Sequence, residues 1–477
     1  MRLPPFLCGG CGKDPAFAGT AMTYEQFKNQ VTGKRAEVLG IGVSNLPLID
    51  FLLECGMTVR ARDKKNEDAL GECAKTLKEK GVELILGDGY LEELDGDYIF
   101  RSPGIRPDLP QIVKGVKKGA VLTSEMEVFF ELCPARTIAV TGSDGKTTTT
   151  TLISLLLKEA GHRVFVGGNI GAPLLPHVRE MREGDFAVLE LSSFQLMTMK
   201  RSAEISVVTN LSPNHLDWHT GMEEYIKAKT NIFTHGENRL LILNADNEAS
   251  APLKELAGGE VEYFSSKRRD TALYDQDGVI FEGDRALLSS KNILLPGGHN
   301  RQNYMAAYLA TRQFISPEHL ASVAKSFGGV EHRLEFVREY RGIRCYNSSI
   351  DSSPSRTAAA LSCFDQKVVV ICGGYDKNIP FEPLAEALCK KAKKVVLTGA
   401  TMMKIAGALF MCEAEEKPAY YMNPDFDAAV QVALTLCEEG DVLLLSPACA
   451  SFDAFPNFMA RGAHFKKLIN DLPEEQS

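Results

Sequence analysis

The chain has 477 residues, which is too long for a single hydrophobic core, so about three domains are expected. Hydrophobic residues make up 44% and charged residues 24% of the sequence, the ordinary balance of a soluble globular protein. The net charge of −9 and the lack of a basic stripe argue against nucleic-acid binding, and no apolar run is long enough to span a membrane.

The first 21 residues differ in composition from the rest of the chain. The run LPPFLCGGCG is too short and too rich in proline and glycine for a signal peptide. We therefore expect a disordered leader over residues 1–21, and Met22 could be the true start. Cys8 and Cys11 form one C-x-x-C pair without a second, so a metal or redox site is an alternative to a flexible leader.

Cysteine usage indicates a reducing compartment. The twelve cysteines are scattered without a repeating frame, and Cys345 and Cys372 stand inside apolar runs. Such residues are expected to be buried thiols, and the protein is expected to be cytoplasmic.

The first βα unit has the order of a mononucleotide-binding fold. Residues 37–45 read EVLGIGVSN, an apolar run that enters a G-x-G at Gly40 and Gly42. A helical pattern follows, and the next strand-like run ends in Asp63. Asn45 replaces the third glycine, so the pattern favours a pyrophosphate at the helix start over a full dinucleotide site. Plain strand-to-helix packing is the alternative.

A second candidate ligand loop follows a later strand. The turn Ser102-Pro103-Gly104 comes just after the apolar run DYIF, where open α/β sheets place their ligands. Residues 131–136 (ELCPAR) then interrupt the pattern and indicate a domain boundary.

Residues 136–161 predict a phosphate-binding loop. An apolar strand enters the turn Gly142–Gly145, then Lys146 and Thr147 open an amphipathic helix. Glycines let backbone N–H groups face phosphate oxygens, the lysine brings a positive charge, and the threonine hydroxyl can bind Mg²⁺. The full G-x-x-x-x-G-K-[ST] pattern would need glycine at Val140, so a chance Gly-Lys-Thr at a helix start is the alternative.

Further polar side chains follow strands of the same region. Glu190 lies near the end of an apolar strand, where a carboxylate can hold Mg²⁺. His215 and His219 have the i, i+4 spacing of a metal pair, although a loop with Pro213 makes surface or capping roles equally reasonable. Lys229 lies on a helix with its stem toward the apolar face, a pattern more typical of a snorkelling lysine than of a catalytic one.

The last third of the chain predicts another parallel α/β unit. The strand-like runs KVVVICGGYDK, KKVVLTGA and DVLLLSPACASFD each end in Gly, Ser or Pro. Before them, DGVIFEGDRALLSS has the alternation of a small antiparallel excursion. Arg333 stands near the junction, where it could reach phosphates or form an interdomain ion pair.

Nine motifs in order resemble the Mur ligase family, and the last is most similar to its D-glutamate-adding members. The resemblance covers nearly everything from Met22 onward. The motifs are TGSDGKTTT, GGNIGAP, LELSSFQL, TNLSPNHLD with a later AK, GGHNRQN, EHRLE, YNSS, GGYDK and SPACASFDAFPNF.

The resemblance implies an α/β protein of three domains. A Rossmann-like domain over 22–132 would bind the UDP substrate, and a P-loop-type ATPase domain with a mainly parallel sheet over 133–329 would bind ATP. A Rossmann-like domain over 330–477 would bind the amino acid. The implied reaction is ATP-dependent amide formation between UDP-N-acetylmuramoyl-L-alanine and D-glutamate through an acyl phosphate, in peptidoglycan precursor synthesis. We expect a monomer that uses ATP and Mg²⁺.

The family's functional positions fall on specific residues of this sequence. The implied ATP site comprises Gly142, Ser143, Asp144, Gly145, Lys146, Thr147, Thr148, Asn169, Asn300, Asn303 and Arg333. The implied metal ligands are Thr147, Glu190, His215 and, if it is carbamylated, Lys229. The implied catalytic residues are Lys146, Glu190, His215 and Lys229.

The two other substrates are implied to bind elsewhere on the chain. The UDP substrate would lie on Gly42, Val43, Ser44, Asn45, Asp63, Ser102, Pro103 and Gly104. D-Glutamate would lie on Ser352, Lys377, Ser451, Phe452 and Phe458.

One departure from the family pattern keeps an alternative open. The family usually has Asn-Asp-Ser where this chain has Asn347-Ser348-Ser349, with Asp351 three residues later. A nucleotide-binding homologue with impaired turnover is therefore one alternative. Another Mur or folylpolyglutamate-type ligase is the second, although Phe452 and the absence of an Asp-Asn-Pro-Arg string argue against it.

Overall fold

The computed structural model describes residues 22–473, so the predicted leader over residues 1–21 lies outside the described residues. Contacts between residues divide the chain into two compact units. The first unit extends to Lys146 and resumes over Gly161–Tyr263, and the second comprises Thr147–Ala160 and the chain from Phe264 onward. Across the described residues no helix has both the length and the apolar character needed to cross a membrane.

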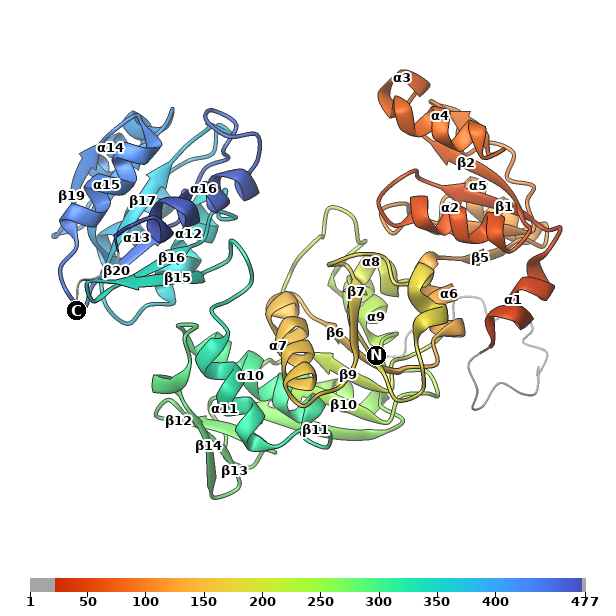
Figure 1. The fold of residues 1–477 in the computed structure, drawn as a ribbon, viewed down its shortest axis with the longest axis horizontal. Helices are drawn as coiled ribbons and strands as arrows, with labels where there is room; N and C mark the ends of the chain where they lie inside the picture. The colour runs from red at the N-terminus through yellow and green to blue at the C-terminus, as the bar shows by residue number, and fades with distance from the viewer. Residues whose placement is uncertain (1–21, 474–477) are drawn as a thin grey trace. The chain divides into compact units, whose positions relative to one another are not determined.

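The first unit begins with a sheet of five parallel strands, part of the red and orange region in Figure 1. The strand order is β3-β2-β1-β4-β5. Its strands are β1 (Arg35–Leu39), β2 (Thr58–Asp63), β3 (Glu83–Leu86), β4 (Tyr98–Arg101) and β5 (Val121–Thr123). The helices of this part are α1 (Tyr24–Val31), α2 (Asn45–Glu54), α3 (Glu67–Leu70), α4 (Glu72–Glu79), α5 (Pro110–Lys117) and α6 (Glu125–Leu132).

Strand β1 shows how side-chain alternation builds two cores around this sheet. Ala36 and Val38 belong to the large hydrophobic core that also receives α1 and α2. Leu39 belongs to a smaller core with Ile99 and Ile112. Successive side chains of a strand point to opposite faces, so the apolar run buries both faces of the sheet, as parallel sheets require.

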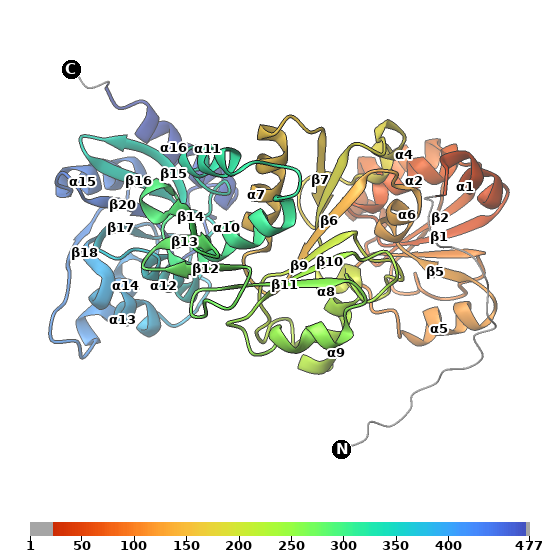
Figure 2. The ribbon, with the colours of Figure 1, turned by 90° about the horizontal axis from the view of Figure 1, so that it is seen from below.

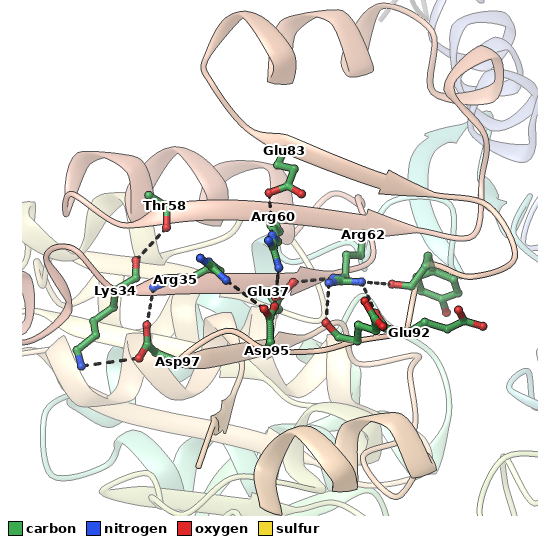
Figure 3. Close-up of polar contacts among 12 residues, drawn as sticks. Lys34, Arg35, Glu37, Thr58, Arg60, Arg62, Glu83, Glu92, Asp95 and Asp97 are labelled. Carbon is green, nitrogen blue, oxygen red and sulfur yellow. Dashed lines mark hydrogen bonds and ion pairs between the residues drawn. The ribbon is translucent and has the colours of Figure 1, made fainter. Parts of the chain in front are cut away.

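A buried ion pair joins β1 to β2 on one face of this sheet (Figure 3). Arg62 Nε lies 2.6 Å from Glu37 Oε2, and both side chains are almost fully buried. Arg62 also donates to the carbonyls of Tyr90 and Glu92, in the connection between β3 and β4. Arg60 lies 3.4 Å from the other Glu37 oxygen. Because Glu37 and Arg62 each have several partners, the pair holds the connection between β3 and β4 against β1 and β2.

The first unit continues into a second parallel sheet, in which β6 lies between β8 and β9. Its strands are β6 (Arg136–Thr141), β7 (Val164–Gly168), β8 (Phe186–Glu190), β9 (Ile205–Val208), β10 (Leu240–Asn244) and β11 (Glu260–Ser265). The helical elements here are η1 (Leu175–Glu180), α8 (Ser193–Leu196), α9 (Met222–Thr230) and η2 (Ala251–Leu256).

The second unit resumes at Phe264 with an antiparallel excursion at the end of β11. β12 pairs in parallel with residues 264–265 of β11, and β13 and β14 then add antiparallel strands, which confirms the predicted excursion. These strands are β12 (Leu273–Gln276), β13 (Val279–Glu282) and β14 (Arg285–Ser289). The helices are α7 (Lys146–Glu159), η3 (Ser290–Asn292), α10 (Gly298–Thr311) and α11 (Pro317–Ser326).

The chain ends in a six-stranded sheet in the order β15-β16-β20-β17-β18-β19, parallel except for the β15–β16 pair. Helices α12, α13 and α14 pack on one face, and α15 and α16 on the other (Figures 1 and 2). The strands are β15 (Glu335–Tyr340), β16 (Ile343–Asn347), β17 (Val368–Gly373), β18 (Ala392–Thr398), β19 (Ala419–Met422) and β20 (Val442–Leu445). The helices are α12 (Pro354–Ser362), α13 (Glu382–Lys391), α14 (Met402–Met411), α15 (Phe426–Leu436) and α16 (Phe458–Asn470).

The predicted α/β class with mainly parallel sheets is therefore confirmed. The cysteines of residues 22–473 are free thiols, and Cys345 and Cys372 are fully buried in strands as predicted. Cys8 and Cys11 lie outside the described residues.

Glu125 is a buried carboxyl at the start of α6, and it makes the stability of this protein depend on pH. Its Oε1 accepts a hydrogen bond from Leu175 N at 3.3 Å, and burial raises the pKa of Glu125 to about 7. In the unfolded chain this group ionises near its ordinary pKa of 4.5. The folded protein therefore becomes less stable relative to the unfolded chain as the pH rises from 4.5 to about 7.

We expect Glu125→Gln to raise the midpoint of thermal unfolding at pH 8 and to change it little at pH 5. The amide keeps the acceptor for Leu175 N but carries no charge, so the expected gain at pH 8 is on the order of 1–3 kcal/mol. Differential scanning calorimetry at both pH values measures it, with the exposed Glu25→Gln as the control. Equal shifts at both pH values would contradict the assignment.

Candidate functional site

The phosphate-loop candidate connects β6 to α7 and has a backbone that requires glycine. Gly142 has φ +144° and Gly145 has φ +78°, both in the region that L side chains rarely adopt. A Cβ at Gly142 would lie 2.0 Å from Thr209 Oγ1 and 3.0 Å from Asn210 O. The turn is therefore closely packed against the segment that follows β9 and has no room for a side chain at position 142.

Side chains after β9 fix the shape of this turn. Asn210 Oδ1 accepts from the backbone N–H of Asp144 at 3.0 Å, and Thr209 Oγ1 donates to the Asp144 carbonyl at 2.6 Å. Ser143 Oγ donates to the carbonyl of Ser212 at 3.0 Å. These contacts hold the backbone of the loop in one conformation before a ligand binds.

Two lysine side chains converge on the carbonyl of Gly142. Lys146 Nζ donates to Gly142 O at 3.1 Å and to Ser143 O at 2.9 Å. Lys229 Nζ donates to Gly142 O at 2.8 Å and to Thr141 Oγ1 at 3.2 Å, and it lies 4.7 Å from the ring centroid of Tyr225. The structure thus brings together Lys146 and Lys229, two predicted catalytic residues that are 83 positions apart in the sequence.

Lys229 is buried, with only 2% of its surface exposed. Burial lowers its pKa well below the usual value, and the charge of Lys146 lowers it further, while Glu190 and Asp144 act in the opposite direction. The amine therefore loses its proton more readily than a surface lysine does. An unprotonated amine is the form that reacts with carbon dioxide.

Glu190 ends β8 beside the phosphate loop and is held there by Asn169. Asn169 Nδ2 donates to Glu190 Oε1 at 2.9 Å, and Asn169 N donates to Glu190 O at 2.7 Å. Gly168 precedes this pair with φ +96°, and a Cβ there would lie 2.2 Å from Glu190 O. The glycine is required because the two strand ends approach so closely.

His215 and His219 do not form a metal pair in this structure. His215 has φ +54° and packs its ring against Phe194, with centroids 4.9 Å apart. His219 is buried, and its ring nitrogens lie 3.1 Å from Glu224 Oε2 and 2.9 Å from Ser193 Oγ. Burial lowers the pKa of His219, so the neutral ring donates from Nδ1 to the carboxylate and accepts at Nε2 from the serine.

Metal binding by protein side chains alone is not supported. Among residues 22–473, no group of three or more His, Cys, Asp or Glu side chains is arranged to hold a metal ion. A single buried carboxylate, Glu190, next to an organised phosphate loop instead fits a hard cation such as Mg²⁺, which takes most of its ligands from phosphates and water. The residues present therefore fit a metal that binds together with a nucleotide.

The predicted UDP-substrate turn after β1 is stabilised by its own polar residues. Asp63 Oδ2 accepts from Ile41 N at 2.7 Å, and Asp63 Oδ1 accepts from Lys65 N at 2.9 Å. Asn45 Nδ2 donates to the carbonyls of Leu39 and Gly40. Asp63 and Asn45 therefore shape the turn.

The exposed part of this turn is formed by its small residues. Gly42 is exposed, Ser44 is half-buried, and Val43 is 79% exposed. These residues are the ones that a ligand can reach.

The second predicted UDP loop, Ser102–Gly104, is held in place by hydrogen bonds from the side chain of Arg101. This arginine is buried, and its Nη1 donates to Pro103 O at 2.9 Å and to Ile105 O at 2.7 Å. Its Nη2 donates to Phe194 O at 2.8 Å, and burial lowers the pKa of Arg101 to about 10. A small cavity lies beside the loop and is lined by Ser44, Asn45, Arg101, Pro103, Ser124, Glu125, Met126 and Gln195.

The predicted nucleotide residues of the second unit form a buried amide pair. Asn300 Nδ2 donates to Pro296 O at 2.7 Å, and Asn303 Nδ2 donates to Asn300 Oδ1 at 3.1 Å. Thr149 Oγ1 of α7 donates to Asn303 Oδ1 at 3.2 Å. The pair therefore fastens α10 to α7, whereas the side chain of Arg333 is exposed.

The predicted D-glutamate residues gather in the C-terminal sheet region. Lys377 Nζ donates to Ser352 O at 3.3 Å and to Ser352 Oγ at 3.4 Å, so the structure brings these two together. Phe452 is 64% exposed and lies edge-on to Tyr375. Ser451 is buried, and its carbonyl accepts from backbone N–H groups of the same loop.

Phe458 begins α16 within the same region. Its ring is edge-on to that of His332, with centroids 6.0 Å apart. Ser349 Oγ donates to the carbonyl of Phe458 at 2.8 Å, so the start of α16 is tied to the segment after β16.

Comparison with known proteins places the chain in a family. Residues 34–124 match the MurD-like N-terminal domain of Mur ligases, residues 140–311 the Mur ligase middle domain, and residues 332–449 the glutamate ligase domain. The UDP-N-acetylmuramoylalanine–D-glutamate ligase of Clostridium botulinum (strain Alaska E43 / Type E3) is 48% identical over 454 residues, with 94% of this chain and 99% of the relative covered. The ligase of the same name from Clostridium novyi (strain NT) is also 48% identical, with the same coverage.

The chain belongs to the UDP-N-acetylmuramoylalanine–D-glutamate ligase family. The resemblance inferred from nine motifs is therefore confirmed.

Solved structures show the same fold at low identity. UDP-N-acetylmuramate-alanine ligase MurC from Thermotoga maritima has a TM-score of 0.56 at 17% identity, covering 92% of this chain and 100% of that chain. A UDP-N-acetylmuramoyl-L-alanyl-D-glutamate–2,6-diaminopimelate ligase has a TM-score of 0.55 at 18% identity, covering 91% of both chains. At these identities the likeness supports the α/β fold of this D-glutamate ligase family member and nothing finer.

The sequence did not single out two buried arginines that organise candidate loops in this family member. Arg101 supports Ser102–Gly104, as described above. Arg461 donates from Nη1 to Ala450 O, from Nη2 to Cys449 O and from Nε to Ser349 Oγ, each at 3.0 Å. An arginine inside or next to an apolar run is the sequence feature that could have revealed them. Such an arginine is rarely buried unless its charge is paired or hydrogen-bonded.

Ser348, at the position where the family resemblance implies an aspartate, lies beside Asp351 in a buried position. Ser348 Oγ accepts from Leu334 N at 3.1 Å, and Asp351 Oδ2 accepts from Ser446 Oγ at 2.8 Å. Burial raises the pKa of Asp351 to about 6, and hydrogen bonds from Ser348 and Ser446 partly offset this.

We expect Ser348→Asp to give less than a tenfold gain in kcat in this D-glutamate ligase family member, a change of about 1.4 kcal/mol or less. It would also lower the thermal stability, because a second carboxylate would be buried beside Asp351. Steady-state ADP formation and thermal unfolding measure the two effects. A larger kcat gain, or unchanged stability, would contradict this expectation.

Proposed function

We propose that this protein is an ATP-dependent ligase that joins D-glutamate to UDP-N-acetylmuramoyl-L-alanine in peptidoglycan precursor synthesis, acting as a cytoplasmic monomer. The observation that carries the proposal is the match, along 94% of the chain, to relatives that bear this ligase's name. The organised phosphate loop, with two lysines and a carboxylate beside it, supports the ATP-dependent half of the reaction.

The chemistry requires that the alanine carboxylate be activated, because a carboxylate and an amine do not condense directly. The carboxylate attacks the γ-phosphorus of ATP and releases ADP, which leaves an acyl phosphate. The D-glutamate amine then attacks the acyl carbon, a tetrahedral intermediate forms, and phosphate leaves as the amide is made. Positioning of reactants and charge stabilisation supply most of the acceleration in such transfers.

The phosphate loop and its lysine would hold the nucleotide. The glycine turn and the start of α7 that follows it would face the phosphate oxygens, while the N–H of Asp144 stays bonded to Asn210. Lys146 would move from its loop carbonyls to the terminal phosphates. Asn169, Asn300, Asn303, Thr148 and Arg333 would complete the ATP site as the family resemblance implies.

Mg²⁺ would be held by Thr147, Glu190, His215 and a carbamylated Lys229 together with the nucleotide. When bound, the ion would neutralise charge that builds up on the transferring phosphoryl group. Asn169 keeps the Glu190 carboxylate in place by its 2.9 Å hydrogen bond. A carbamate on Lys229 would convert a cation into an anionic ligand, and the lowered pKa of this buried amine supports such a modification.

The other substrates would bind on separate parts of the chain. The UDP substrate would contact Gly42–Asn45, Asp63 and Ser102–Gly104. D-Glutamate would contact the Lys377–Ser352 pair, Ser451, Phe452 and Phe458. We also propose the domain boundaries implied by the resemblance, 22–132, 133–329 and 330–477.

A coupled assay for ADP release tests the proposal. With ATP, Mg²⁺ and UDP-N-acetylmuramoyl-L-alanine present, ADP formation should depend on D-glutamate, and L-lysine should not replace it. Equal rates with D-glutamate and L-lysine would refute the D-glutamate assignment and favour another Mur or folylpolyglutamate-type ligase.

A nucleotide-binding homologue with impaired turnover is the second candidate, because Ser348 replaces the family aspartate. Binding of ATP without ADP formation, even with both other substrates present, would favour it. Steady-state turnover in the same assay would exclude it.

A further inference from the structure

Two loops of the first unit are joined at the sole tryptophan of the chain. Trp218 Nε1 donates to Gly104 O, in the predicted UDP-substrate loop, at 3.1 Å. Arg106 Nη1 donates to the carbonyl of Trp218 at 2.6 Å, and the guanidinium lies 4.9 Å from the indole centroid. Both the ring and the backbone of Trp218 are therefore fastened to the segment that follows β4.

Glu224, at the start of α9, anchors the other side of this junction. Arg106 Nη2 and Nη1 donate to Glu224 Oε1 and Oε2 at 2.9 and 3.1 Å, a two-pronged contact between residues 118 positions apart. Glu224 Oε2 also accepts from Thr220 N at 2.9 Å and from His219 Nδ1 at 3.1 Å. Such charge-assisted pairs fix orientation as well as distance.

The same turn holds His215 in a strained conformation. The backbone N–H groups of Trp218 and His219 donate to His215 O at 3.1 and 3.0 Å. A left-handed φ costs a non-glycine residue roughly 1–2 kcal/mol and persists only where surrounding contacts enforce it. Phe194 packs against the rings of His215 and Trp218, with centroids 4.9 and 4.7 Å away.

We propose that Arg106, Trp218 and Glu224 form a latch that couples the UDP-substrate loop to the position of His215. This inference rests on the proposed function, since it assigns three positioning residues to that reaction. A ligand seated on residues 102–105 would stabilise the Gly104–Trp218 contact, and this contact would hold the turn that sets His215. None of the three residues needs to touch the reacting atoms.

The contact pattern distinguishes the latch from an ordinary surface ion pair. The Arg268–Asp270 pair is also two-pronged, but its residues are two positions apart and more than half exposed. Arg106 makes a local contact of this kind with Asp108, at 2.9 and 2.8 Å, but it also pairs with Glu224 and binds the Trp218 carbonyl. Arg106 and Glu224 keep about a fifth of their side-chain surface exposed. Their contacts therefore hold two separate loops in register.

Fluorescence of Trp218 tests the latch without turnover. Because the chain has one tryptophan, its emission reports this junction alone. Titration of the wild-type protein with UDP should give a saturable change in emission. In Arg106→Ala the emission of the free protein should shift to longer wavelength, and the response to UDP should be lost or weakened at least about fivefold in affinity.

Steady-state kinetics of the variants provide a second test of the latch. Arg106→Ala should raise the KM for UDP-N-acetylmuramoyl-L-alanine and lower kcat, each by about tenfold, while the KM for ATP changes less than about threefold. Arg106→Lys should recover part of the loss, and Trp218→Phe should raise the same KM because it removes the bond to Gly104 while keeping an aromatic ring. Arg268→Ala is the matched control and should behave like the wild type.

The outcomes separate the latch from the proposed function. No saturable response of the wild type to UDP, kinetics of Arg106→Ala equal to those of Arg268→Ala, or equal losses for all three substrates would each overturn the latch. If the wild type shows no D-glutamate-dependent turnover, the proposed function is wrong. The UDP titration followed by Trp218 fluorescence then tests the latch by itself.

Discussion

Replacing Gly142 with alanine is expected to abolish turnover, with a fall in kcat of at least about 100-fold. The new methyl group would lie 2.0 Å from Thr209 Oγ1, and the backbone would have to leave φ +144°. Either change would displace the loop backbone and, with it, the position of Lys146 at the start of α7. ADP release under saturating substrates measures the loss.

Gly184→Ala is the matched control, because a Cβ there meets no atom within 4 Å. Saturable fluorescence of Trp218 with UDP should persist in Gly142→Ala, which shows that the first unit still folds. Turnover within about threefold of the wild type would refute the requirement for glycine at this position.

Replacing Lys229 with methionine is expected to have an effect of similar size, a fall in kcat of at least about 100-fold. Methionine fills a similar volume but can neither donate to the Gly142 carbonyl nor carry a carbamate. The same assay measures the change, and Lys227→Met, an exposed lysine on the same helix, is the control.

Bicarbonate dependence separates the two roles of Lys229. If its carbamate is a metal ligand, activity of the wild type should fall in buffer depleted of carbon dioxide and return when bicarbonate is added. Activity that is independent of bicarbonate would leave Lys229 as a structural donor to the loop and would contradict carbamylation.

Local patterns predicted the strand, the glycine turn and the helix start around Gly142–Lys146 correctly, because such elements are determined by neighbouring residues. The same holds for Gly40 and Gly42 and for the antiparallel excursion of β13 and β14. In each case backbone geometry and side-chain alternation are visible within about ten positions of sequence.

Long-range partners were not accessible to such patterns. Helical spacing suggested that Lys229 lies along an apolar face, whereas the structure buries its amine against Gly142, 87 positions away. The spacing of His215 and His219 suggested a metal pair, but Glu224 and Ser193 occupy the ring of His219. Which polar groups satisfy one another depends on the tertiary fold, which periodicity does not contain.

The buried pair between Glu37 and Arg62 bears on how faithfully the first sheet assembles. Ala36 and Val38 flank Glu37 and point to the opposite, apolar face. A slip of β1 by one residue would exchange these faces and leave a lone carboxylate among hydrocarbon side chains, at a cost of several kcal/mol. The buried charge therefore favours the native alignment of β1 over an alignment shifted by one residue.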